Sequence, residues 1–217
     1  MKIQFLTSKN SWLNLNKKEQ VKRYLKKCSK KITIINNFKD IKKNNDILII
    51  LSYFKIIPEN FLKRSKYNLV VHESDLPKGK GHSPLFWQIL KGKNKVTFTL
   101  FEASKNVDSG KYYLKKDFFF KKNYLYDEIK NCQFEFSLSL ILKFLKNFKS
   151  SKKIKSYIQK GKSTFYKKRV KESSELNIRK SLIKQFNLLR IVNNEGHPAF
   201  FNFKGNKYII KIFKEKK

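Results

Sequence analysis

The sequence predicts an α/β protein built on a doubly wound, mostly parallel sheet. Residues 46–52 (DILIILS) and 67–72 (YNLVVH) form short apolar runs, which are typical of strands buried on both faces. Helical patterns separate runs of this kind along the first 150 residues. Strands that alternate with helices indicate crossover connections, and these produce a parallel sheet.

The individual elements follow from local patterns of apolar residues. We expect strands over 2–7, 31–36, 46–52, 67–72, 96–102 and 112–120. We expect helices over 16–28, 58–62, 85–90 and 127–148. In the last helix, one stripe is apolar, which indicates a face packed on the core rather than a partner-binding face. This stripe consists of Phe134, Leu138, Ile141 and Leu145.

We divide the chain into a first domain over residues 1–150 and a small C-terminal α+β annex over 151–217. A Lys- and Ser-rich stretch near 150–163 is interpreted as a surface connection between them. The annex is expected to hold a helix over 176–190 and a β-hairpin of strands 199–203 and 207–213, with its turn at Gly205-Asn206. We expect the annex to pack on the first domain, because a separate core of that size would be marginal.

The net charge is unusually positive. The chain has 51 Lys and Arg against 16 Asp and Glu, which gives +35. Such a balance suggests nucleic acid or an anionic membrane. Only 5 of the basic residues are Arg, which phosphate and base readers favour, and the lysines are spread along the whole chain. We therefore interpret the charge mainly as solvated surface with a secondary attraction for phosphorylated ligands, and we disfavour a nucleic-acid partner.

Cysteine usage and hydropathy predict a soluble cytoplasmic protein with no membrane partner. Cys28 and Cys132 lack CxxC spacing, which favours reduced thiols over a disulfide. The apolar start of the chain is too short for a signal peptide, and no window approaches the roughly 18 apolar residues of a membrane span. His72, His82 and His197 lack the spacing of a zinc site, so we expect no metal.

Residues 67–110 carry the candidate chemistry. His72 ends a predicted buried strand, and Asp108 lies one helix and one strand later in the turn sequence VDSG. Between them, HESDLPKGKGHSP places two Pro and two Gly directly after a strand, which favours a shaped ligand cradle. Singly, each is an ordinary core or turn residue. Together they predict a base and its partner at one edge of the sheet.

These residues resemble motifs of the folate-dependent formyltransferases. The loop HESDLPKGKGHSP resembles the family's HxSLLPxxRGxxP loop, and residues 96–110 resemble the VTxHxxxxxxDxG segment that follows it. Residues 163–178 are similar to a downstream segment of the family, and residues 185–212 to the C-terminal segment of its short sugar-nucleotide members. The resemblance covers nearly the whole chain and implies a Rossmann-like formyltransferase core.

The resemblance implies transfer of a formyl group from 10-formyl-tetrahydrofolate to a primary amine, with no metal. By position, it implies that His72 and Asp108 are the catalytic residues. His72 would stabilise an oxyanion on the formyl oxygen, while Asp108 would orient His72 and handle protons through a water molecule. The implied folate-contacting loop residues are Ser74, Asp75, Leu76 and Pro77.

Three residues depart from the family pattern. Val70 stands where the family has an asparagine two residues before the histidine, and Asn68 is a poor substitute because strand rise places it about 13 Å from His72. Ser74 or a backbone amide would have to supply the missing hydrogen bond, or catalysis is weaker or absent. Asp75 replaces a leucine, and Lys80 replaces the usual loop arginine.

The resemblance favours a nucleotide-linked amino sugar as the acceptor, with tetrahydrofolate as the other product. The diphosphate of such an acceptor needs cationic contacts. Our candidates are Lys9, Lys78, Lys80, Arg169 and Arg190. Trp12 follows the first strand, where it would either stack on a base or sugar or plug the end of the sheet.

Two alternatives stay open. A methionyl-tRNA formyltransferase-like enzyme agrees with the charge, but those proteins carry a barrel-like tRNA domain, which needs more residues than follow the first domain here. A catalytically degenerate RNA-binding homologue is supported by aromatic residues interleaved with lysines, as in YKKRVK and FFFKKNY. The sequence does not specify the sugar, the nucleotide or the acceptor amine, and a homodimer is among the alternatives for the oligomeric state.

Overall fold

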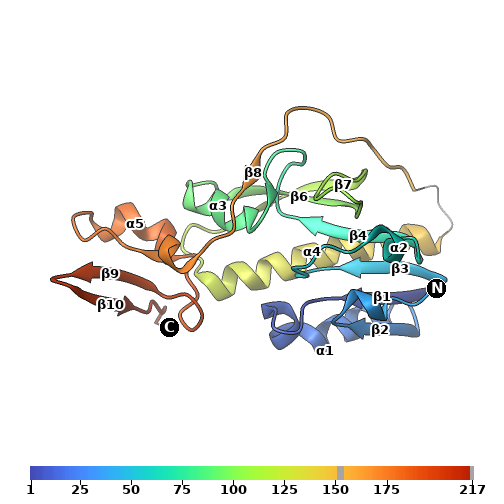
Figure 1. Ribbon diagram of the computed structural model, residues 1–217, viewed down its shortest axis with the longest axis horizontal. Helices are drawn as coiled ribbons and strands as arrows, with labels where there is room; N and C mark the ends of the chain where they lie inside the picture. Colours follow the sequence, from blue (N-terminus) through green and yellow to red (C-terminus); the bar gives the residue numbers. More distant parts are fainter. Residues whose placement is uncertain (151–153, 216–217) are drawn as a thin grey trace.

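The structure is a computed structural model that describes residues 1–150 and 154–215. Its main sheet has six strands in the order β2-β1-β3-β4-β6-β7 (Figure 1). They are β1 (Lys2–Leu6), β2 (Lys31–Ile35), β3 (Asn45–Ile50), β4 (Ser65–His72), β6 (Lys95–Glu102) and β7 (Tyr112–Phe119). The first four are parallel, whereas β6 and β7 are antiparallel to their neighbours. The prediction of a mostly parallel α/β sheet is therefore confirmed.

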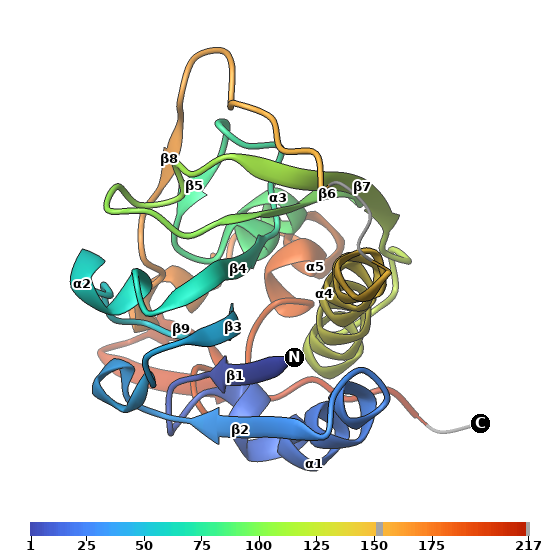
Figure 2. The same cartoon turned by 90° about the vertical axis from the view of Figure 1, so that its right-hand side faces the viewer.

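Helices cover both faces of the sheet (Figure 2). On one face lie α1 (Trp12–Lys26) and α4 (Tyr126–Lys149), and on the other lie α2 (Glu59–Leu62) and the short 3₁₀ helix η1 (Phe38–Asp40). Alternate residues of β3 therefore enter different cores. Ile47 and Ile49 pack with α1 and α4, while Leu48 and Ile50 pack on the α2 side. Burial on both faces explains the apolar run of this strand.

Local sequence sets where the two long helices begin. The Ser11 hydroxyl accepts a hydrogen bond from the Asn14 backbone, so α1 begins four residues before the predicted start at residue 16. At the start of α4, the Glu128 carboxylate accepts a hydrogen bond from the Leu125 backbone at 2.8 Å. The predicted apolar stripe of α4 is confirmed, because its four residues are at most 3% exposed.

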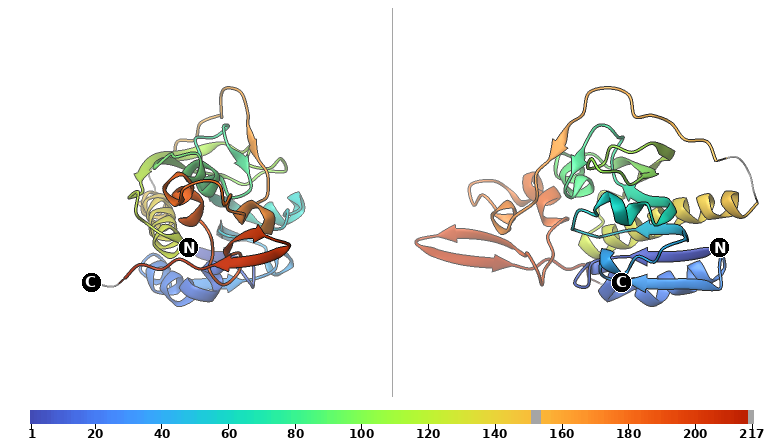
Figure 3. Two further views of the ribbon diagram at one scale, coloured as in Figure 1. Left: turned by 90° about the vertical axis from the view of Figure 1, so that its left-hand side faces the viewer. Right: turned by 45° about the vertical axis from the view of Figure 1, so that its right-hand side comes forward.

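The annex extends from one end of the sheet (Figure 3). It contains the 3₁₀ helix η2 (Lys171–Ser174), α5 (Leu182–Leu189), β9 (Ala199–Phe203) and β10 (Asn206–Ile210). The predicted helix over 176–190 was too long, because the Leu176 backbone donates to the Phe200 carbonyl and residues 175–176 run beside β9. The hairpin turn is Lys204-Gly205, one residue earlier than predicted. Both have positive φ, 45° and 77°, as a two-residue turn requires.

The connections complete the fold. Between β4 and β6 lie the two-residue strand β5 (Lys80–Gly81) and the helix α3 (Pro84–Leu90), and β5 pairs with β8 (Phe165–Tyr166). Residues 151–153 are outside the described part, and both the predicted domain boundary and part of the predicted connection over 150–163 fall there. Among the described helices, none combines the length and apolar character needed to cross a membrane.

Candidate active site

His72 and Asp108 meet at the carboxyl edge of the parallel strands, where open α/β sheets bind ligands. The His72 Nε2 atom lies 3.7 Å from Asp108 Oδ2, so their predicted proximity is confirmed. The chain reaches Asp108 through a loop rather than through the end of β6. Because β6 runs antiparallel to β4, Thr99 lies beside His72, and β6 ends beside Leu69, three residues away from that edge. The loop over 103–111 folds back to bring Asp108 to His72.

The backbone of this loop fixes the Asp108 turn. Asp108 has φ of 50°, a left-handed conformation that is uncommon for a residue other than glycine. At Gly110, a Cβ atom would overlap the backbone of Glu102, so only glycine fits. The Asp108 Oδ2 atom accepts a hydrogen bond from the Gly81 backbone at 2.9 Å. The carboxylate is thus held from both loops of the site.

The His72 ring is almost buried, with its side chain 9% exposed. Its Nε2 atom lies 2.8 Å from the Gly79 carbonyl oxygen. A carbonyl only accepts hydrogen bonds, so Nε2 carries the proton in this contact. The Asp108 oxygen at 3.7 Å is too distant for a direct hydrogen bond but close enough to attract a positive ring. The pair therefore presents a hydrogen-bond donor with a carboxylate beside it.

The loop after His72 combines exposed and buried residues. The Lys115 ammonium group lies 2.6 Å from Asp75 Oδ1 and also donates to the Leu76 carbonyl at 2.6 Å. The side chains of Leu76 and Pro77 are buried within the protein. Ser74 is only 2% exposed, and its hydroxyl oxygen has no hydrogen-bond partner in the described part of the chain. Among the four predicted folate-contacting residues, Ser74 has an unused hydrogen-bonding group and Asp75 faces solvent.

Three predicted cationic residues lie in loops at this edge. Lys9 and Lys78 are exposed in the loops after β1 and β4. Lys80 is buried, at 7% exposure, and its ammonium group donates to the Ser109 hydroxyl at 2.7 Å. Lys80 therefore ties the loop after β4 to the turn that carries Asp108.

The two predicted arginines are not brought to this edge. Arg190 is 1% exposed, and its guanidinium donates to the carbonyls of Lys121 and Tyr124 and to the side chains of Asn94 and Asn187. Burial lowers the pKa of Arg190, an effect partly opposed by Glu128. Arg169 donates to the carbonyls of Ser173 and Ile191 within the annex. Both guanidinium groups bind protein atoms around the annex.

The position of the missing asparagine is apolar. Val70 packs in the cluster on the α2 side of the sheet and pairs with Phe101 across the strands. Asn68 is not a replacement, since its amide nitrogen donates to the Glu102 carboxylate and to the Leu62 carbonyl. The nearby unpartnered hydroxyl of Ser74 is the remaining side-chain candidate for the missing donor.

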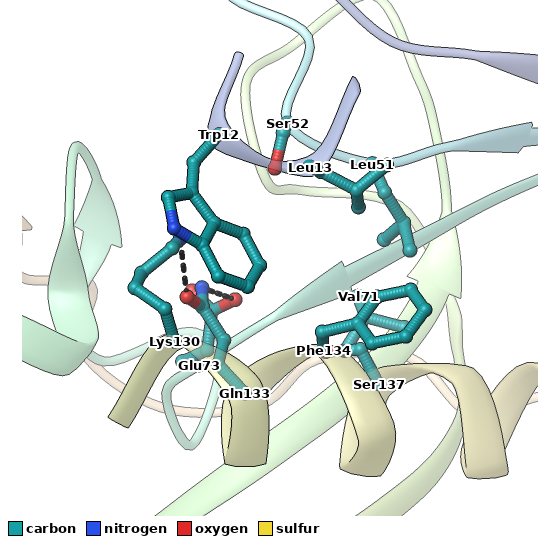
Figure 4. Close-up of a pocket in the computed structure, with 10 residues that line it drawn as sticks. All are labelled: Trp12, Leu13, Leu51, Ser52, Val71, Glu73, Lys130, Gln133, Phe134 and Ser137. Carbon is teal, nitrogen blue, oxygen red and sulfur yellow. Dashed lines mark hydrogen bonds between the residues drawn. The ribbon is translucent and has the colours of Figure 1, made fainter. Parts of the chain in front are cut away.

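A cavity opens on the α1 and α4 side of the same edge (Figure 4). Trp12 forms one wall, and the ends of β3 and β4 and one side of α4 form the others. Lys130 donates to Gln133 at 2.6 Å, and Gln133 donates to Glu73 at 2.5 Å. Burial lowers the pKa of Lys130, while Glu73 opposes this shift. Trp12 thus borders this cavity and also packs against the main core.

Sequence reasoning missed the segment that covers the loop after β4. The Thr164 hydroxyl accepts a hydrogen bond from the Gly79 backbone at 2.8 Å, and the Thr164 carbonyl accepts one from the Lys80 backbone at 2.8 Å. The Gln159 side chain donates to the Asp108 and Gly110 carbonyls. Gln159 lies in a Lys- and Ser-rich coil without apolar periodicity, so no local pattern marks it. Thr164 falls within the segment that resembles the family, but its contact with the loop after β4 was not predicted. Among the described residues, no cluster of three or more His, Cys, Asp or Glu side chains could hold a metal ion.

Known proteins with similar sequences share one activity name. Residues 3–136 match the family described as formyl transferase. The methionyl-tRNA formyltransferase of Rickettsia massiliae (strain Mtu5) is 30% identical over 172 residues, which make up 79% of this chain and 55% of that protein. The chain thus spans about half the length of the curated relatives it matches.

Three solved structures have the same fold. Methionyl-tRNA formyltransferase from Clostridium thermocellum has a TM-score of 0.79 at 21% identity, covering 100% of this chain and 94% of that one. HypX from Aquifex aeolicus in complex with tetrahydrofolic acid has a TM-score of 0.78 at 18% sequence identity, and the match covers 98% of this chain and 37% of that one. A sugar N-formyltransferase from Shewanella sp. FDAARGOS_354 has a TM-score of 0.70 at 15% sequence identity, and the match covers 100% of this chain and 99% of that one. Since the family match spans more than half of the chain, the chain belongs to the formyl transferase family.

Proposed function

We propose that this chain transfers a formyl group from 10-formyl-tetrahydrofolate to a primary amine. The observation that carries the proposal is the placement of His72 Nε2 3.7 Å from Asp108 Oδ2, in the two loops that resemble the family motifs. One buried oxygen atom in the loop after His72, Ser74 Oγ, lacks a partner among the described residues. It suits a ligand with hydrogen-bonding groups, and the tetrahydrofolic acid complex of HypX supports a folate.

Each catalytic residue has one role. The folate supplies a formyl carbon that an amine can attack, and negative charge develops on the formyl oxygen. In the unliganded site the Nε2 proton of His72 is donated to the Gly79 carbonyl; when the formyl group binds, the proton exchanges this acceptor for the formyl oxygen and stabilises that charge. The Asp108 carboxylate orients His72 and, through a water molecule, accepts the proton that the amine releases. The bond between the formyl carbon and the folate nitrogen then breaks, and the same proton passes to that nitrogen, so that tetrahydrofolate leaves. The Ser74 hydroxyl supplies the donor that an asparagine would provide at position 70.

The first acceptor we propose is an amino sugar linked to a nucleotide. It is supported by the resemblance of residues 185–212 to the sugar-nucleotide members and by the Shewanella structure, which matches along 99% of its length. Lys9, Lys78 and Trp12 lie at the edge of the sheet where its diphosphate and base would bind. We assign Arg190 to holding the annex instead, because its guanidinium donates to protein acceptors there. We assign Arg169 to the same role, because both of its Nη atoms donate to backbone carbonyls within the annex, although its buried Nε has no partner among the described residues.

The second acceptor is methionyl-tRNA. Two observations favour it: the 30% identity to the Rickettsia enzyme and the net charge of +35, which suits a polyanionic carrier. The solved Clostridium structure shares its fold with this chain along 94% of its length.

One experiment tests the activity and separates the acceptors. The purified chain is incubated with 10-formyl-tetrahydrofolate and, in separate reactions, a panel of nucleotide-linked amino sugars or methionyl-tRNA. Mass spectrometry reads the formyl group on the amine. Formylation of one sugar and not of the tRNA supports the first acceptor, and the reverse result supports the second. Salt-dependent retention of RNA without folate binding would replace both with a degenerate RNA-binding protein.

A further inference from the structure

A segment outside the motif-bearing loops crosses over the candidate site. We call residues 154–168 the strap; in Figure 1 its orange trace arches above β7 and β6 and descends into β8. It contacts both loops of the site. Tyr157 exchanges two backbone hydrogen bonds with Tyr112, just after the Asp108 turn, and Thr164 binds the backbone of Gly79 and Lys80.

One strap side chain reaches the Asp108 turn directly. The Gln159 Nε2 atom donates to the Asp108 carbonyl at 3.0 Å and to the Gly110 carbonyl at 2.8 Å. It therefore bridges the two carbonyls on either side of Ser109. Asp108 is left-handed here, and Gly110 has no space for a side chain. Both bonds close a turn that an unconstrained chain would adopt reluctantly.

The carbonyl oxygen of the Gln159 amide indicates that the side chain does more than fill space. Gln159 Oε1 is buried and has no partner among the described residues. A buried unpaired acceptor costs free energy. Simple filling of space would favour an apolar side chain, which has no such cost. An amide at this position is explained if its two hydrogen bonds, to the Asp108 and Gly110 carbonyls, are needed to hold the turn.

We infer that Gln159 is a positioning residue that holds the Asp108 turn so that its carboxylate faces His72. This inference rests on the proposed function, because it assigns the turn a role in formyl transfer. Gln159 acts through Asp108 and does not touch the reacting atoms. A displacement of about 1 Å in such a constellation lowers turnover by up to roughly 100-fold.

The test compares Gln159→Leu and Gln159→Glu with Ile158→Ala, a neighbouring strap residue that is 69% exposed. In Gln159→Leu we expect kcat to fall by about 10- to 100-fold, with KM for 10-formyl-tetrahydrofolate and the melting temperature little changed. In Gln159→Glu, an ionised carboxylate cannot donate to the two carbonyls. A protonated one can donate once, so the activity of this variant relative to wild type should rise as pH falls. Ile158→Ala should match wild type.

Two readouts separate positioning from a structural role. In an Asp108→Asn background, Gln159→Leu should add little further loss, because the residue acts through the carboxylate that is already altered. Independently of turnover, the imidazole nitrogen resonances of His72 should move in Gln159→Leu and stay in place in Ile158→Ala. The NMR readout holds even if no acceptor is found, so failure of the proposed function is distinguishable. Gln159→Leu with wild-type kcat, or with unmoved His72 resonances, would overturn the inference.

Discussion

The edge that carries His72 and the annex that carries Arg190 bury polar groups in different ways. At the edge, two buried oxygens have no partner, and the Asp108 turn is held in a left-handed conformation. In the annex, the guanidinium of Arg190 has four protein acceptors, drawn from α5, the loop before β6 and the loop before α4. In the described part of the chain, two side chains at the edge keep unused acceptors, whereas each of the three guanidinium nitrogens of Arg190 has a protein partner.

This difference separates sites for ligands from sites for stability. A buried polar atom without a partner lowers stability unless something else binds it, whereas a fully bonded buried cation joins the elements around it. Residue type alone does not decide between the two cases. Lys80 and Arg190 were both plausible phosphate binders by sequence, yet Lys80 bonds Ser109 beside Asp108 and Arg190 fixes the annex.

Removing either catalytic candidate should give the largest effect on turnover. We expect His72→Ala and Asp108→Ala each to lower kcat by about 10²- to 10⁴-fold, the usual contribution of a positioned acid or base. The fold should remain, as judged by far-UV circular dichroism and a cooperative melting transition. Substantial turnover in either purified variant would remove that residue from the mechanism.

Arg190→Met should show the opposite behaviour. The substitution leaves two buried carbonyls and two amide oxygens without their donor, so we expect the free energy of unfolding to fall by on the order of 3 kcal/mol. The kcat per folded molecule should stay near wild type. Urea denaturation measures the first quantity, and assays well below the melting temperature measure the second. Arg179→Met, at an exposed annex position, is the matched control. A specific loss of kcat in Arg190→Met would place Arg190 back among the substrate contacts.

The sequence predicted the regular part of the molecule better than the site. Strands such as β3 and the stripe of α4 follow from apolar spacing, which burial on fixed faces imposes. His72 and Asp108 carried motif and turn signals, so their proximity was predictable. Gln159 and Thr164 were not, because a side-chain hydrogen bond from a coil leaves no periodic trace. Residues 176–181 were predicted as helix, but Leu176 bonds to Phe200 of β9 and residues 178–180 form a turn before α5.

Val70→Asn probes the departure from the family pattern at the edge. We expect kcat to be unchanged or raised, because an amide at this position can supply the hydrogen bond that we assign to Ser74. The apolar packing of Val70 should make the variant less stable, by about 1–3 kcal/mol for a buried amide. Steady-state kinetics of Val70→Asn, Ser74→Ala and the double variant test the assignment. A large loss of kcat in Val70→Asn would mean that the site has been rebuilt around valine.

Glu102→Gln should give the smallest effect and tests whether a buried carboxyl group away from that edge lowers stability. Burial raises the pKa of Glu102, and hydrogen bonds from Tyr113 and Asn68 only partly oppose this. The folded state therefore binds the Glu102 proton more tightly than the unfolded state does. As pH rises from the ordinary value of 4.5 toward the raised folded pKa, this group makes the fold progressively less stable.

A glutamine keeps an acceptor for Asn68 and does not ionise. Glu102→Gln should thus have a higher urea midpoint than wild type at pH 7, and the difference should shrink as pH falls below 4.5. If the two urea midpoints differ by the same amount at both pH values, packing rather than the buried charge causes the difference in stability.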